Sequence, residues 1–177
     1  MMKKIVSFMS ILLLVGGVFA FTQVATWKLG KDYAIEFSAK GVDGIFKTFS
    51  ATINFDETKL AASKFSMSLD VNSINTGNGL QNKHAIGDEW FDAEKFPKIK
   101  FTSSSFEKTS AGYSVKGKLQ VKDVTKDVTI PFTFAKKGNK GTFVASFSID
   151  RSVYGVGKSG GDVSNNIKIT ATLPVSK

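Results

Sequence analysis

The chain has 177 residues, no cysteine, and 24 lysines and arginines against 15 aspartates and glutamates, which gives a formal net charge of +9. The absence of cysteine excludes a small disulfide-stapled secreted module, and a single histidine, His84, excludes a two-histidine metal site. The lysines are scattered along the chain instead of clustered, so a solvated basic surface is favoured over a nucleic-acid partner.

The first twenty residues have the pattern of a secretory signal peptide. Two early lysines precede an apolar run over 5–19, and Val18 and Ala20 take the −3 and −1 positions of a small-residue cleavage site. A retained membrane anchor is the alternative, but a spanning helix needs roughly 20 apolar residues. We therefore expect cleavage after Ala20, export to the periplasm or medium, and one mature domain over 21–177 without a transmembrane segment.

Period-two alternation of apolar and polar residues dominates from residue 33 to the end. Each alternating set places one strand face on apolar matter and the other on water, which is typical of antiparallel sheets. The eight sets cover residues 33–38, 49–55, 65–71, 99–103, 113–121, 128–134, 143–149 and 167–173. Turn-forming residues join most of them, so the sequence predicts an all-β, eight-stranded antiparallel barrel or sandwich.

One connection, between Val71 and Lys98, is far longer than a hairpin loop. Loops of that length inside a compact domain are usually functional or carry structure of their own. We expect a short helical segment within 79–95, between the third and fourth strands, with Trp90 and Phe91 as its apolar anchors.

Sixteen phenylalanines are the strongest compositional feature. They fall in the apolar phase of the strands, so they belong inside the barrel and not on an exposed face that stacks on nucleic acid. A barrel of about eight strands is either filled by side chains or just wide enough for one small ligand. The residues expected to form the apolar wall of such a site are Phe37, Phe49, Phe55, Met67, Phe101, Leu119, Phe132 and Phe147.

The only arginine of the chain, Arg151, follows the seventh alternating set, beside an aromatic residue and a glycine turn. A lone arginine in that setting indicates a fixed fork of hydrogen bonds that either closes one barrel end or meets an anionic head group. Together with His84, Trp90 and Phe91 it is our candidate for the mouth of the site.

Four motifs, in this order, resemble the YceI-like family, whose members are exported, lipocalin-like barrels described as polyisoprenoid-binding. They are Trp27 with the strands of 33–38 and 44–56; the run from Ser73 through His84 and Trp90 to Phe101; Gly117–Leu119 with Val124–Lys126; and Asp150–Val156. The resemblance covers 27–173. It implies a lipocalin-like barrel whose bore holds a polyisoprenoid or another long-chain, lipid-like amphiphile.

Two other functions stay open. A small hydrolase or isomerase would use His84 and the carboxylates near it, such as Asp88 and Asp92, whereas a structural protein would fill its bore with phenylalanine. Of the three functions we favour the binding protein, with no catalytic residue, no metal and no cofactor. A homodimer is compatible with the sequence.

Overall fold

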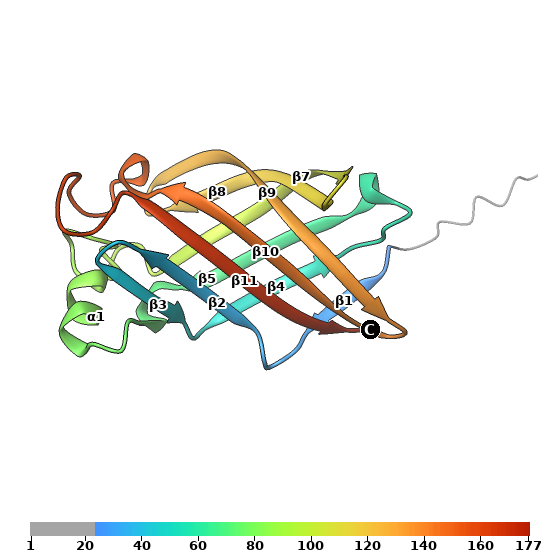
Figure 1. Ribbon diagram of the computed structural model, residues 1–177, viewed down its shortest axis with the longest axis horizontal. Helices are drawn as coiled ribbons and strands as arrows, with labels where there is room; N and C mark the ends of the chain where they lie inside the picture. The colour runs from blue at the N-terminus through green and yellow to red at the C-terminus, as the bar shows by residue number, and fades with distance from the viewer. Residues whose placement is uncertain (1–23) are drawn as a thin grey trace, which may run out of the picture.

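The computed structural model describes residues 24–177, so the expected signal peptide lies outside the described residues. They form one barrel, with a single α-helix at one end of its long axis and the C-terminus at the other (Figure 1). The elements are β1 (Thr26–Leu29), β2 (Ala34–Ala39), β3 (Val42–Phe46), β4 (Phe49–Asn54), β5 (Lys64–Asp70), β6 (Ile74–Asn75), α1 (Gly79–Ile86), β7 (Lys98–Thr109), β8 (Gly112–Val121), β9 (Val124–Lys137), β10 (Lys140–Asp150) and β11 (Asn166–Ser176).

The strands close into a ring with eight positions. Antiparallel neighbours follow one another as β1, β4, β5, β7, β8, β9, β10 and β11, and β11 then pairs with β1. Three positions consist of two strands end to end, since β2 continues β1 beside β11, β3 continues into β4, and β6 extends β5. The predicted eight-stranded antiparallel barrel, with a short helix between the third and fourth positions, is confirmed.

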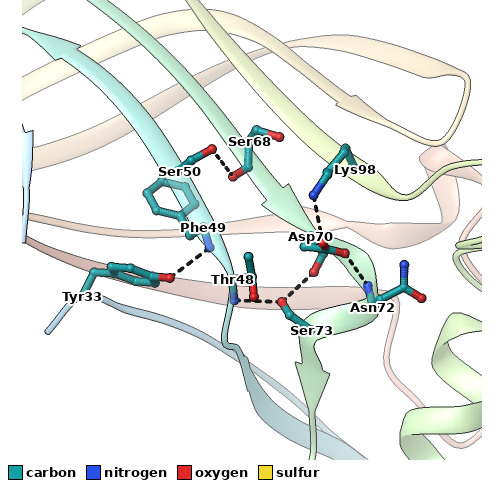
Figure 2. Close-up of polar contacts among 9 residues, drawn as sticks. All are labelled: Tyr33, Thr48, Phe49, Ser50, Ser68, Asp70, Asn72, Ser73 and Lys98. Carbon is teal, nitrogen blue, oxygen red and sulfur yellow. Dashed lines mark hydrogen bonds and ion pairs between the residues drawn. The ribbon is translucent and has the colours of Figure 1, made fainter. Parts of the chain in front are cut away.

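Side chains replace ladder hydrogen bonds where these strands are interrupted (Figure 2). Between β3 and β4, the Tyr33 hydroxyl donates to the Lys47 carbonyl at 2.9 Å and accepts from the Phe49 amide at 3.1 Å. The Thr48 amide donates to the Ser73 hydroxyl at 3.0 Å. Because polar side chains satisfy the backbone at the breaks in β3–β4 and β5–β6, the barrel wall stays closed there although the strands do not run through.

The ladder between β9 and β10 stops halfway. Its pairs run from Lys137 with Lys140 to Phe132 with Ala145, and the next residue of β9 is Pro131. Proline has no N–H to donate to a ladder and therefore favours strand edges. Residues 124–131 consequently pair only with β8, and 146–150 only with β11.

Within residues 24–177 no helix is both long enough and apolar enough to cross a bilayer.

Candidate ligand cavity

The half of the barrel nearer α1 is hollow and holds a cavity of about 450 Å³, which residues of α1 also line. That volume lies within the range of roughly 300–1,000 Å³ that is usual for small-molecule sites. Inward positions of the strands supply most of its wall, which includes Ile35, Phe37, Phe49, Met67, Leu69, Ile99, Phe101, Leu119, Val121, Ile130, Phe147, Ile149, Ile167 and Ile169. The wall is apolar because these residues occupy the phase of each strand that the alternating pattern directs inward.

Small residues keep this half of the bore open. Ala145 and Ala171 are cross-strand partners on β10 and β11, and both line the cavity. A Cβ atom on Gly117 would lie 2.6 Å from the Phe101 ring, so that ring packs directly against the backbone of the neighbouring strand. Such close packing directs aromatic bulk along the wall and away from the axis of the bore.

The other half of the barrel is filled by an aromatic plug, which consists of Phe55, Phe65, Phe106, Tyr113, Phe132, Phe134 and Phe143. Phe55 is 1% exposed, and its ring centroid lies 5.3–6.0 Å from those of all six other members. Most of these ring pairs are edge-to-face or tilted, which is a favourable geometry for aromatic quadrupoles. The cavity ends on this plug, because Phe65, Phe132 and Phe143 also line it.

Arg151 organises the loop over 151–165 at the mouth. It is 4% exposed, and its guanidinium donates to the carbonyls of Ser164 (3.1 Å), Val156 (2.6 Å), Lys158 (3.0 Å) and Val163 (2.7 Å). None of the ion pairs among residues 24–177 involves it. Four of its five N–H donors therefore serve the loop, and one is left for other partners.

The segment over 72–97 is fastened to that loop across the mouth. The Trp90 ring lies 5.0 Å from the Arg151 guanidinium carbon, in a cation–π contact. The Lys122 ammonium, from the turn between β8 and β9, donates to the carbonyls of Trp90 at 3.0 Å and Gly155 at 3.1 Å. The Gly157 amide donates to the Glu89 carbonyl at 3.1 Å. The segment over 72–97, the turn between β8 and β9 and the loop over 151–165 thus contact one another at one rim of the cavity.

His84 lies on α1 at the mouth, where it lines the cavity but is exposed. Within the described residues its ring forms no ion pair and no side-chain hydrogen bond. The neighbouring carboxylates have other partners, since Asp92 pairs with Lys95 at 3.0 Å and Asp88 accepts from the Glu89 amide at 2.9 Å. The histidine and the carboxylates therefore do not form an acid–base pair in this structure. No cluster of three or more potential metal ligands occurs over 24–177.

Tyr154 is a further polar residue of the cavity wall. It is 3% exposed, and burial raises the pKa of its hydroxyl. The group is therefore uncharged at neutral pH and can donate or accept a hydrogen bond.

The structure gathers eleven of the twelve residues proposed from the sequence around this cavity, with His84, Trp90, Phe91 and Arg151 at the mouth and seven of the other eight on the wall. The exception is Phe55, which we expected on the wall. It lies instead in the centre of the aromatic plug, because its position just after β4 carries it beyond the hollow half.

Several functional positions escaped the sequence analysis. No sequence motif marks Ala145 and Ala171, which line the cavity, or Lys122, which holds the segment over 72–97 at its rim. The signal that could have located the open half is the distribution of aromatic residues along the strands. On β9, for example, Phe132 and Phe134 lie toward the plug, whereas Val128 and Ile130 lie toward the mouth.

Comparison with known proteins gives consistent matches. The family model described as YceI-like domain matches residues 27–175. A UPF0312 protein of Yersinia enterocolitica is 32% identical over 133 residues, which cover 71% of this chain and 69% of that protein. The crystal structure of Burkholderia cenocepacia BcnA has a TM-score of 0.79 at 31% identity and covers 85% of this chain and 100% of that chain.

A more distant structural neighbour is a polyisoprenoid binding domain from Saccharophagus degradans that is implicated in plant cell wall breakdown. It has a TM-score of 0.63 at 15% identity, with 87% of this chain and 99% of that chain covered. At this identity the likeness concerns the fold alone.

Proposed function

Because the chain belongs to the YceI-like domain family, we propose that it is a binding protein whose bore holds a lipid-like amphiphile, such as a polyisoprenoid or another long-chain isoprenoid. The observation that carries this proposal is the apolar cavity of about 450 Å³, which is closed by the plug at one end and rimmed by a few polar groups at the other. The description of the Saccharophagus degradans domain as polyisoprenoid-binding supports it at the level of the fold.

The wall favours a hydrocarbon tail over a polar ligand. Burial of an apolar chain contributes about 0.8 kcal/mol per CH₂ group, so ten enclosed carbons provide roughly 8 kcal/mol before the cost of association. Such a ligand needs no specific polar contact along its tail. Its head group would lie at the mouth, within reach of Trp90, His84 and the remaining Arg151 donor.

We favour binding over catalysis because the only histidine has no carboxylate partner at the mouth. A hydrolase or isomerase would require a base that a second group orients. If Asp88→Asn, Asp92→Asn or His84→Gln changed turnover of an apolar ester while ligand retention stayed the same, the enzyme alternative would be favoured.

The test of the binding function is extraction of the purified protein with organic solvent, followed by mass spectrometry and by uptake of an added isoprenoid alcohol. Ala145→Phe places a ring inside the bore and should abolish retention. Val144→Phe is the matched control, because Val144 is 39% exposed on the outer face of the same strand. Absence of any co-purifying lipid together with absence of uptake in the unmodified protein would overturn the proposal.

We further propose that the protein acts after export to the periplasm. The support is the charged start, apolar run and small-residue junction of the first twenty residues. N-terminal sequencing of the protein from a periplasmic fraction should begin at Phe21. A chain recovered only from the cytoplasm with Met1 intact would contradict export.

A further inference from the structure

We propose that the aromatic plug sets the length of chain that the bore encloses, at about three isoprene units, and that Phe132 and Phe143 on its surface determine this limit. The inference rests on the proposed function, because it specifies which ligands that same site accepts. It concerns the enclosed part of the ligand; a longer chain would leave its remainder outside the mouth.

The depth of the hollow half supplies the first estimate. Cavity-lining positions run from Phe143 to Ile149 on β10 and from Leu173 back to Ile167 on β11. At a rise of about 3.4 Å per residue and a strand tilt near 40°, roughly, this span corresponds to a depth of about 15 Å. An extended chain advances about 1.2 Å per bond, so about twelve chain carbons fit, or about three isoprene units.

The volume gives a minimum that agrees with this depth. At about 30 Å³ per water-sized group, the cavity of about 450 Å³ has room for at least about fifteen methyl or methylene groups. Three isoprene units contain about that many carbons once their methyl branches are counted, so the depth of the bore, and not its volume, limits the enclosed chain.

The plug can act as a fixed floor because its rings support one another from behind. The Phe143 ring stacks on Phe134 at 4.2 Å, and Phe132 stacks on Tyr113 at 5.5 Å. Both floor residues are under 7% exposed, and the fully buried Phe55 lies behind them at 5.4 and 5.6 Å. A close-packed interior resists displacement, so a chain that is too long cannot push the rings aside without loss of these contacts.

The test is calorimetric titration of isoprenoid alcohols with two, three, four, five and six units. We expect each added unit to tighten binding by at least roughly tenfold up to about three units, and further units to change it by less than about threefold. Phe143→Ala should move this plateau to about four units, and Phe132→Leu is a second floor variant that removes less volume. Val144→Ala is the control, because Val144 is 39% exposed on the outer face of the same strand as Phe143 and should leave both the affinity and the plateau in place.

Two results would overturn the inference while the proposed function remains. One is affinity that keeps rising beyond three units, which would mean that the plug does not limit the enclosed chain. The other is a plateau that neither floor variant moves, although both melt cooperatively. Failure of the unmodified protein to bind any of the alcohols would instead overturn the proposed function and this inference with it.

Discussion

Replacement of Arg151 by lysine tests whether this residue mainly supports the mouth of the barrel. Lysine keeps the positive charge but presents its donors from a single nitrogen, so it cannot reach the four carbonyls that the guanidinium now satisfies. We expect Arg151→Lys to lose two or more of these bonds and the planar contact with Trp90.

The magnitude follows from the environment of the group. Hydrogen bonds to charged groups contribute about 1.5–3 kcal/mol each, and buried carbonyls left unpaired add their own desolvation cost. Because the loop can partly relax toward water, we expect the free energy of unfolding to fall by roughly 3 kcal/mol. For a domain of this size that loss lowers Tm by about 6–12 °C.

Urea denaturation measures this change, and hydrogen exchange locates it, since amides over 156–165 should lose protection before the strands do. Lys168→Arg is a suitable control, because Lys168 is exposed on the outer face of β11. If Arg151→Lys left stability within about 0.5 kcal/mol of the unmodified protein while ligand affinity dropped, Arg151 would be a head-group contact and our structural reasoning would be refuted.

Three further changes have defined outcomes. Gly117→Ala should destabilise by about 1–3 kcal/mol, since its Cβ would meet the Phe101 ring, whereas Gly79→Ala, with nothing within 4 Å, should be near neutral in the same thermal melts. Equal effects would refute the packing argument. The pKa of Asp70 is held below its ordinary value of 3.8, chiefly by a hydrogen bond from Lys98, so its stabilisation is present above that pH and lost as the pH falls through the lowered value. Asp70→Asn should therefore reduce stability at neutral pH and converge with the unmodified protein in acid; a constant difference down to acid pH would contradict this. Lys122→Met keeps the apolar stem but removes both rim hydrogen bonds, so hydrogen exchange should rise over 88–91 and 155–157, and unchanged exchange would show that the other contacts suffice.

The alternation of apolar residues predicted all eight strand positions, because a half-buried antiparallel strand must present one apolar face. It did not predict β1, β3 or β6. Those strands are short. Near their ends the side chains of Tyr33 and Ser73 form hydrogen bonds with backbone groups in place of ladder bonds, and the alternation with a period of two is lost there. These breaks depend on contacts between residues far apart in the chain, which a local sequence pattern cannot predict.

The sequence predicted which residues form the wall of the candidate site, but it did not predict how deep the cavity is. An inward phenylalanine has the same phase whether it lines a cavity or fills a core, as the pair Phe101 and Phe55 illustrates. The two are separated only by their height in the barrel, which depends on strand register and tilt. The role of Arg151 could not be predicted for a similar reason. Its acceptors are backbone carbonyls, and every residue carries a backbone carbonyl whatever its side chain.

The two tryptophans allow the most direct test of a ligand in the open half of the bore. Trp90 lies at the mouth, whereas Trp27 packs on Phe134 at the plugged end, with its ring centroid 5.2 Å away. Titration of the Trp27→Phe variant with a three-unit isoprenoid alcohol should give a saturable, one-to-one change in the emission of Trp90. The Trp90→Phe variant, which reports only from Trp27, should bind by calorimetry without a comparable emission change. No change in either variant, or equal changes in both, would contradict a ligand held between the mouth and the plug.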